Sequence, residues 1–345
     1  MGCFLISFCL GNTGITVCQN AFGALPIQRV DMETAAGILR RAYEGGMRFF
    51  DTARAYSDSE EKLGNAFAGM RDKIYIASKT MGRTPEEFKS QLETSLNMLQ
   101  TDYIDIYQFH CVDMCYRPGD GTGMYECMLE AKEQGKIRHI GVTAHKLSVA
   151  RECVESGLYE TLQYPLSYLS SEKEVELVNM CRERNMGFIA MKGLAGGLIN
   201  NSKAAFAYMS QFDNVLPIWG IQKMEELEEW LGYMTESPVY DEEIKAFIEK
   251  EKAELTGDFC RGCGYCMPCP AGIQINNCAR MSLMVRRAPS ANWLNEQWQE
   301  NMKQIENCLD CGQCKSKCPY ELDTPNLLRK NYEDYKKILA GEVEV

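Results

Sequence analysis

Short apolar runs alternate with stretches in which apolar residues recur at helical spacing over residues 19–234. Short apolar runs bounded by polar residues are typical of buried strands, and the longer stretches are typical of amphipathic helices. The pattern predicts strands at 19–27, 48–52, 73–78, 103–109, 138–143, 161–166, 187–191 and 214–219. It predicts helices at 31–46, 58–69, 84–99, 124–134, 146–156, 171–185, 202–211 and 224–234. Strand–helix pairs repeated in this way predict an α/β fold, a (β/α)₈ TIM barrel.

The rest of the chain has a different pattern, with charged helical stretches and clustered cysteines. We assign the charged helix at 238–255 to a link over 238–256, between a barrel at 1–237 and a C-terminal domain at 257–345. The boundary is expected near Thr256–Gly257. Segments 278–288, 295–308 and 324–341 have helical patterns, the last with a predicted cap at Thr324. The sequence therefore predicts a small, mainly helical domain after the barrel.

Four polar residues follow or end three consecutive predicted strands: Asp51, Tyr56, Lys79 and His110. In a (β/α)₈ barrel the carboxyl ends of the strands form the rim that carries the chemistry. Asp and Tyr after a strand more often cap the next helix, so this pair alone proves little. A carboxylate, a phenol, an ammonium and an imidazole on neighbouring strand ends nevertheless form a set that can handle protons.

Composition narrows the class of function. The formal net charge of −11 argues against nucleic acid or an anionic membrane as a partner, since both require a basic surface. No apolar run approaches the roughly 18 residues that span a bilayer. The opening MGCFLISFCL has no basic segment and no small-residue cleavage site, so we expect no signal peptide. We interpret it as the start of a β-hairpin that closes the bottom of the barrel.

Eight of the seventeen cysteines occur in two tight runs that each end in Cys-Pro. Such runs are typical of thiolates that hold iron–sulfur clusters in a reducing compartment, so we expect a cytoplasmic protein. Three cysteines of each run hold one [4Fe-4S] cluster, and the fourth holds the other cluster. The expected ligand sets are Cys260, Cys263, Cys266 and Cys318 for the first cluster, and Cys308, Cys311, Cys314 and Cys269 for the second. The alternative is zinc, although four-Cys zinc sites normally pair two C-x₂-C knuckles.

The barrel sequence resembles the aldo-keto reductase family. The resemblance covers about residues 8–235 and is carried by LGNTGITV at 10–17, FFDTARAY at 49–56, ASKT at 77–80, IDIYQFH at 104–110 and IRHIGVT at 137–143. Residues 256–325 resemble the dicluster iron–sulfur domain that is fused to one branch of that family. The resemblance implies a catalytic tetrad of Asp51, Tyr56, Lys79 and His110.

In that tetrad Tyr56 would give a proton to the oxygen of a carbonyl that is reduced by hydride. Lys79 would pull the pKa of the phenol from its usual ~10 toward neutrality. Asp51 would anchor Lys79, and His110 would orient the carbonyl oxygen. Cys111 and Cys115 follow His110 and are more simply structural than metal ligands.

The resemblance also implies a nicotinamide cofactor, with contacts from Thr143, Gln163, Met191, Lys192, Gly193, Gly220 and Lys223. The family's Ser-Asn pair after the fifth strand is replaced here by Thr143–Ala144. Glu226 stands near the position where the family places an Arg for the 2′-phosphate, and a carboxylate would repel that group. The choice between NADPH and NADH therefore stays open. A flavin is possible but no motif indicates one.

These features predict an iron–sulfur oxidoreductase that reduces a small carbonyl compound or oxidises an alcohol. Two alternatives remain, because a hydride carries two electrons and a cluster normally passes one. The clusters could relay electrons between a redox partner protein and a substrate or flavin in the barrel, or the chain could be a non-catalytic electron-transfer module. We expect the cysteine-rich domain to pack near the barrel mouth.

Overall fold

The computed structural model describes residues 7–255, 259–287 and 290–345, which form two compact units. The first unit extends to Gly193 and resumes over Lys203–Ile244. The second comprises Leu194–Ser202 and Lys245–Val345. The loop Leu194–Ser202 therefore belongs to the C-terminal unit although it lies between barrel elements in the sequence. The boundary expected near Thr256–Gly257 falls on residues 256–258, outside the described residues.

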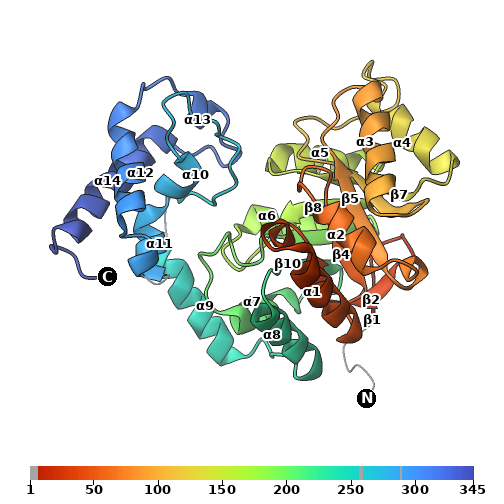
Figure 1. Cartoon of the computed structure of the whole chain (residues 1–345), viewed down its shortest axis with the longest axis horizontal. Helices are drawn as coiled ribbons and strands as arrows, with labels where there is room; N and C mark the ends of the chain where they lie inside the picture. Colours follow the sequence, from red (N-terminus) through yellow and green to blue (C-terminus); the bar gives the residue numbers. More distant parts are fainter. Residues whose placement is uncertain (1–6, 256–258, 288–289) are drawn as a thin grey trace. The chain divides into compact units, whose positions relative to one another are not determined.

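Eight parallel strands close into a barrel in the first unit, in the order β10-β3-β4-β5-β6-β7-β8-β9 (Figure 1). The barrel strands are β3 (Ala21–Gly23), β4 (Phe49–Asp51), β5 (Tyr75–Thr80), β6 (Ile104–Phe109), β7 (Ile137–Thr143), β8 (Thr161–Pro165), β9 (Gly187–Met191) and β10 (Val215–Gly220). The predicted (β/α)₈ fold is confirmed. The strand predicted at 19–27 is shorter because Pro26 begins a 3₁₀ helix, η1 (Pro26–Arg29), and has no amide hydrogen to donate to a sheet.

Helices follow the strands and cover the outside of the barrel (Figure 1). They are α1 (Met32–Glu44), α2 (Ser59–Ala66), α3 (Pro85–Met98), α4 (Met124–Glu133), α5 (Leu147–Ser156), α6 (Glu172–Glu183), α7 (Ser202–Met209) and α8 (Met224–Thr235), with a short 3₁₀ helix η2 (Arg71–Lys73) before β5. Side-chain caps explain several starts: Asp31 accepts a hydrogen bond from the Thr34 amide, and Thr84 accepts one from the Glu87 amide. All eight predicted barrel helices are present.

A β-hairpin precedes the barrel, as predicted. Strand β1 (Ser7–Cys9) pairs antiparallel with β2 (Thr16–Cys18). Its apolar side chains Phe8, Leu10, Ile15 and Val17 share one buried cluster with Phe49, Ala77, Ile106, Ile189 and Leu216 of the barrel strands. Phe49 begins β4 and Leu216 lies near the start of β10, so the hairpin fills the amino-terminal end of the barrel and leaves the opposite rim to the site.

The second unit is helical in its described residues, as predicted. Its helices are α9 (Glu242–Glu254), which begins in the last residues of the first unit, α10 (Ile275–Cys278), α11 (Met281–Arg287), α12 (Glu296–Lys303), α13 (Gln313–Ser316) and α14 (Thr324–Leu339), with 3₁₀ helices η3 (Ser290–Asn292) and η4 (Gln304–Asn307). Its buried core combines aliphatic residues such as Ile273 and Met281 with the cysteines Cys260, Cys266 and Cys314. These cysteines are therefore part of the packing as well as candidate ligands.

Two helix starts differ from the prediction. The linking helix α9 begins at Glu242 rather than 238, because the Asp241 carboxylate accepts a hydrogen bond from the Ile244 amide and ends the extended segment there. Thr324 is the first residue of α14 and not its cap: its hydroxyl donates to the Leu322 carbonyl instead of accepting from the helix.

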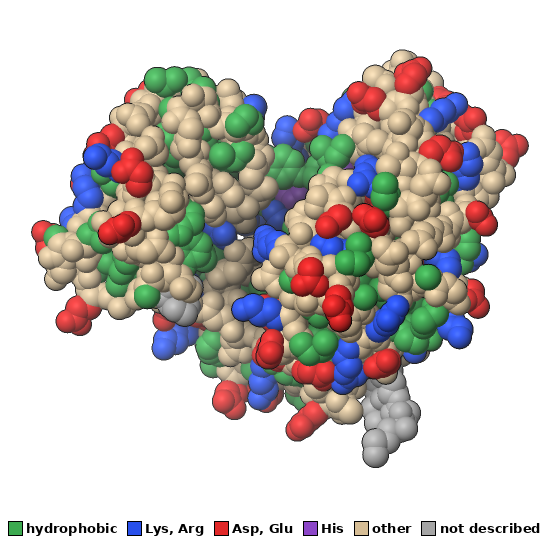
Figure 2. All heavy atoms as spheres, viewed as in Figure 1, with side chains coloured by type: hydrophobic (Ala, Val, Ile, Leu, Met, Phe, Trp, Pro, Cys, Tyr) green, Lys and Arg blue, Asp and Glu red, His purple; other side chains and the backbone are tan. Residues whose placement is uncertain are grey.

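The surface is mixed in charge. In Figure 2 the acidic and basic side chains are interspersed over the visible face. Among the described residues, no helix combines the length and apolar character needed to cross a membrane.

Candidate functional site

The structure brings the four predicted rim residues to one end of the barrel. Asp51 is the last residue of β4, Lys79 lies near the end of β5, and His110 follows β6 directly. Tyr56 lies in the turn between β4 and α2, where the Tyr56 amide donates to the Ala53 carbonyl. Because β4, β5 and β6 are parallel neighbours, their carboxyl ends meet at the same rim. All four side chains reach that rim together.

Asp51 and Lys79 form a buried ion pair. The Lys79 Nζ lies 2.7 Å and 2.8 Å from the two carboxylate oxygens of Asp51, and it donates to the Thr52 carbonyl at 2.6 Å. Burial by itself would lower the pKa of Lys79, but the Asp51 carboxylate beside it turns the net direction upward. Burial raises the pKa of Asp51 against the attraction of Lys79. The pair therefore holds an ammonium in a fixed place inside the rim.

Tyr56 lies over this ammonium. The Lys79 Nζ is 5.1 Å from the centroid of the Tyr56 ring, and the Tyr56 and His110 rings meet edge to face with centroids 5.7 Å apart. Burial raises the pKa of Tyr56 above its usual 10, and the opposing effect of Lys79 is the second largest. The expectation of a Tyr56 pKa drawn toward neutrality is therefore wrong for this structure. The phenol is protonated at neutral pH and holds a proton to donate.

His110 is almost fully buried, and its imidazole is neutral. Burial, and then the charges of Lys79 and Arg83, lower the pKa of His110 to about 3. Its Nδ1 has no hydrogen-bond partner within the described part of the chain. A neutral imidazole with an unused nitrogen is suited to hydrogen bonding with a polar ligand at the rim.

This burial leads to a testable pH dependence. The chain has three histidines, so imidazole NMR signals can be assigned with His110→Asn. We expect His110 not to titrate between about pH 8 and pH 5. Because its pKa is about 3 when folded and 6.5 otherwise, the unfolded chain binds the proton first. Stability from this residue is then lost as pH falls from 6.5 toward 3. A His110 titration near neutrality would contradict this.

Sequence reasoning missed His145 and Arg83 and set Cys111 aside. The Cys111 sulfur lies 3.9 Å from His145 Nδ1, and the Cys111 amide donates to Thr143 Oγ1 at 2.7 Å. Arg83 donates to the Cys111 carbonyl at 3.1 Å. His145 follows β7 by two residues, so the strand-end rule that identified His110 also applied to it. Cys111 has φ 55°, a left-handed conformation that a side-chain-bearing residue rarely adopts.

Most of the predicted nicotinamide contacts lie at or just after the carboxyl ends of barrel strands. Thr143 ends β7, Met191 ends β9, Lys192 and Gly193 follow it, and Gly220 ends β10. Gln163 is buried in the barrel, where its amide oxygen accepts from Gln108 at 2.9 Å and its amide nitrogen donates to Asp51 at 3.4 Å. Both polar atoms of Gln163 are thus engaged with protein.

Lys223 caps the start of α8, but Glu226 occupies the helix terminus. The Glu226 carboxylate accepts hydrogen bonds from the amides of Gln222 at 3.0 Å and Lys223 at 3.2 Å. These are the donors that a helix start otherwise offers to an anion. The α8 terminus therefore already holds a negative charge.

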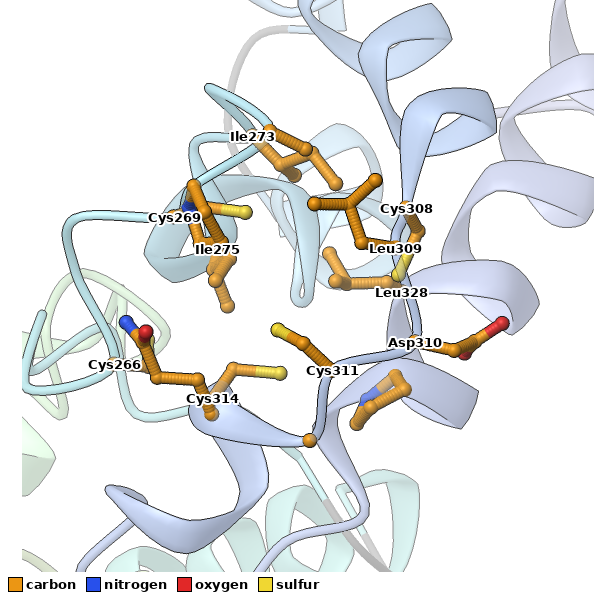
Figure 3. Close-up of a pocket in the computed structure, with 15 residues that line it drawn as sticks. Cys266, Cys269, Ile273, Ile275, Cys308, Leu309, Asp310, Cys311, Cys314 and Leu328 are labelled. Atoms are coloured by element: carbon orange, nitrogen blue, oxygen red, sulfur yellow. The ribbon is translucent and has the colours of Figure 1, made fainter.

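The clustered cysteines of the second unit surround a first cavity. Cys269, Cys308, Cys311 and Cys314 line it, with Cys266 at its edge and apolar walls from Ile273, Ile275, Leu309 and Leu328 (Figure 3). The four cysteines named first are the set expected for the second cluster. Cys311 is exposed, and Leu309 beside it is 66% exposed. This cavity therefore reaches the surface through the Cys308–Cys311 turn.

A second cavity is lined by Cys260, Cys263, Cys266 and Cys318, the set expected for the first cluster. Cys266 lines both cavities, so they are adjacent. Burial raises the pKa of the Cys266 thiol to about 12, so a thiolate there needs a compensating cation. Within the residues described, no three His, Cys, Asp or Glu side chains lie in an arrangement that could hold a single metal ion.

Comparison with known proteins gives a family match for each of the two parts of the chain. Residues 19–213 match the model of the aldo/keto reductase family, and residues 259–323 match that of a 4Fe-4S dicluster domain. The chain is 29% identical over 211 residues to L-galactose dehydrogenase of Arabidopsis thaliana, covering 55% of this chain and 66% of that protein. It is 29% identical over 221 residues to an uncharacterised oxidoreductase of Bacillus subtilis, covering 55% and 67%.

Solved structures share the barrel. An aldo-keto reductase of Klebsiella pneumoniae in complex with NADPH superposes with a TM-score of 0.61 at 22% identity, covering 71% of this chain and 95% of that one. The chain spans about two thirds of the length of the relatives that it matches in sequence. Because the family model covers more than half of the 345 residues, the chain belongs to the aldo/keto reductase family, with a 4Fe-4S dicluster domain at its C-terminal end.

Proposed function

We propose that this chain is an oxidoreductase that interconverts a small carbonyl compound and its alcohol. A nicotinamide cofactor would supply the hydride to the carbonyl carbon. Tyr56 donates its proton to the carbonyl oxygen, Lys79 stabilises the resulting phenolate, and Asp51 holds Lys79 in place. His110, which is neutral, donates a hydrogen bond that orients the carbonyl oxygen. Water then returns a proton to Tyr56.

The observation that carries this proposal is the buried Lys79–Asp51 pair beneath Tyr56. The pair is almost inaccessible to water, and the ammonium lies 5.1 Å from the Tyr56 ring centroid. In the free protein the phenol stays protonated, whereas phenolate formed by proton transfer faces a fixed positive charge in a poorly hydrated place. Lys79 opposes the effect of burial on the phenol, and it therefore lowers the free energy of the phenolate that forms as the proton is transferred.

The cofactor that suits the α8 terminus lacks a 2′-phosphate. The Glu226 carboxylate occupies the amides of Gln222 and Lys223. A carboxylate at such a position can accept a hydrogen bond from a ribose hydroxyl but repels a phosphate. We propose NADH over NADPH, although the Klebsiella pneumoniae structure of the same fold was solved with NADPH.

The Glu226→Gln variant tests this choice. Removing the negative charge is expected to improve the KM for NADPH about tenfold while changing that for NADH much less. Steady-state kinetics with each cofactor checks it. Glu228→Gln provides the control: Glu228 is on the same helix and forms an ion pair with Arg41. Equal changes for both cofactors in Glu226→Gln would contradict the assignment.

We further propose that the second unit holds two [4Fe-4S] clusters. The two cysteine-lined cavities support this, because each is lined by three cysteines of one run and the last cysteine of the other. The first cysteine run has two residues before its last cysteine, whereas the second run has three. Cys269 nevertheless lines the same cavity as Cys308, Cys311 and Cys314. The clusters would supply one-electron transfer or a structural support for the unit.

A second function is favoured by the arrangement of these cavities. They share Cys266, and one of them reaches the surface at Cys311 and Leu309. That arrangement suits entry of electrons from a redox partner protein at one cluster and their passage to the other. In this second function the electron acceptor would be a substrate or flavin in the barrel. In this case Cys311→Ala stops turnover driven by a low-potential electron donor, and Cys9→Ala, at another exposed cysteine, does not. Unchanged donor-driven turnover in Cys311→Ala would eliminate the relay.

One preparation decides between the two functions. Protein purified without oxygen is assayed for iron, sulfide, flavin and nicotinamide, and then for consumption of NADH or NADPH with a panel of aldehydes and ketones. Carbonyl-dependent consumption without an added electron donor supports the first function. Bound flavin, with turnover only from a low-potential donor, supports the second.

A further inference from the structure

The loop Leu194–Ser202 is attached to the second unit by two arginines that are close in sequence. Arg280 donates from Nη1 to the Gly196 carbonyl at 2.7 Å, and Arg287 donates from Nε to the Leu198 carbonyl at 2.7 Å. Both arginines flank or end α11. The loop begins three residues after Met191, the last residue of β9.

Arg280 also lies against the cysteine loop of the second unit. Gly262, between Cys260 and Cys263, has φ 65°, and a Cβ there would lie 2.7 Å from Arg280 Cζ. Only a glycine therefore lets the guanidinium approach this backbone so closely. Burial lowers the pKa of Arg280, and negative charge on Cys260 and Cys263 opposes that effect. An arginine keeps its charge even so, which places a fixed cation beside the expected ligands of the first cluster.

One hydrogen-bond donor of the Arg280 guanidinium is not used by its contacts with the protein. Its Nε is buried and has no hydrogen-bond partner within the described residues. Arg287, in contrast, forms ion pairs with Glu251 and Glu254, and neither arginine belongs to the lining of the two cysteine cavities in the described structure. The two arginines thus differ in what they contact: Arg280 lies against Gly262 in the cysteine loop, and Arg287 is paired with carboxylates.

We propose that Arg280 couples the charge of the first cluster to the loop Leu194–Ser202. The inference rests on the proposed presence of that cluster on Cys260, Cys263, Cys266 and Cys318. One-electron reduction adds a negative charge to the cluster, and a neighbouring cation favours the reduced state. Arg280 accordingly raises the reduction potential of the first cluster, and reduction tightens its hold on the loop.

The first measurement is a redox titration of the full chain with dithionite, followed by EPR, after iron and sulfide have been counted. Arg280→Gln is expected to make reduction of one cluster at least about tenfold less favourable, which is 59 mV for one electron, and to leave the other unchanged. Arg280→Lys keeps the charge and should preserve most of the potential. Arg287→Gln should shift neither cluster.

The second measurement is hydrogen exchange of residues 194–202 in the oxidised and reduced protein. Reduction is expected to slow exchange of this loop in the wild type and to have no such effect in Arg280→Gln. Arg287→Gln should speed exchange equally in both redox states, because it loosens the loop without contacting the cysteines. This difference separates an electrostatic link from a simple anchor.

The outcomes distinguish this inference from the function on which it rests. Protein with two clusters whose potentials are the same in wild type, Arg280→Gln and Arg280→Lys would overturn the role of Arg280 alone. Hydrogen exchange of residues 194–202 at the same rate in the oxidised and reduced wild type would also overturn it. Protein without iron and sulfide would overturn both the clusters and the coupling.

Discussion

Tyr56→Phe is expected to lower kcat for carbonyl reduction by about 10²- to 10⁴-fold, the usual contribution of a positioned general acid. The substitution removes the hydroxyl but keeps the ring, which contacts Lys79 and His110. Substrate and cofactor binding should therefore change little, and the loss should appear in kcat. Kinetics with NADH and a reducible aldehyde measures it, with the iron content as a check on the second unit.

A matched control is available on the same strand as Lys79. Tyr75 begins β5, at the amino-terminal end of the barrel and away from the rim. Tyr75→Phe should retain full activity. Because the phenol of Tyr56 is protonated at neutral pH, the wild-type rate should not fall on acidification for lack of a proton at this residue. Full activity in Tyr56→Phe would show that the rim residues do not transfer the proton as proposed.

Cys266→Ser is expected to have the largest effect on the second unit. Cys266 lines both cavities and is buried in the core of the unit beside Ile273 and Met281. Binding of metal to cysteines supplies folding free energy in small metal-binding domains. The variant should therefore bind at most half of the about eight irons expected for two clusters, and its second unit should become sensitive to protease.

Cys278→Ser is the control for that variant. Cys278 is also buried in this unit but lies outside the lining of both cavities in the described structure, and its sulfur lies 3.7 Å from the Asn301 carbonyl. It should retain all of the iron. Chelation of iron from the wild type should expose the second unit to protease and leave the barrel resistant. Equal iron loss in both variants would mean that packing, and not ligation, explains the effect of Cys266.

Much of the site could be predicted because it depends on short-range rules. Asp51, Lys79 and His110 were found because parallel strands bring their carboxyl ends to one rim. His145 obeys the same rule but was missed: it follows β7 by two residues, and no local pattern distinguishes it from an ordinary loop residue. The direction of the Tyr56 pKa was predicted wrongly, because the sequence shows that Lys79 is near but not how strongly the hydroxyl is buried.

The sequence by itself determined the barrel, the helical character of the second unit and the two runs of four cysteines. These follow from the alternation of apolar positions and from cysteine spacing, both of which act over a few residues. Only the tertiary structure decided that the loop Leu194–Ser202 belongs with the second unit, that Gln163 is engaged with Asp51 and Gln108, and that Arg280 lies against Gly262. These features depend on packing between residues far apart in the chain, and no local pattern records which of them meet.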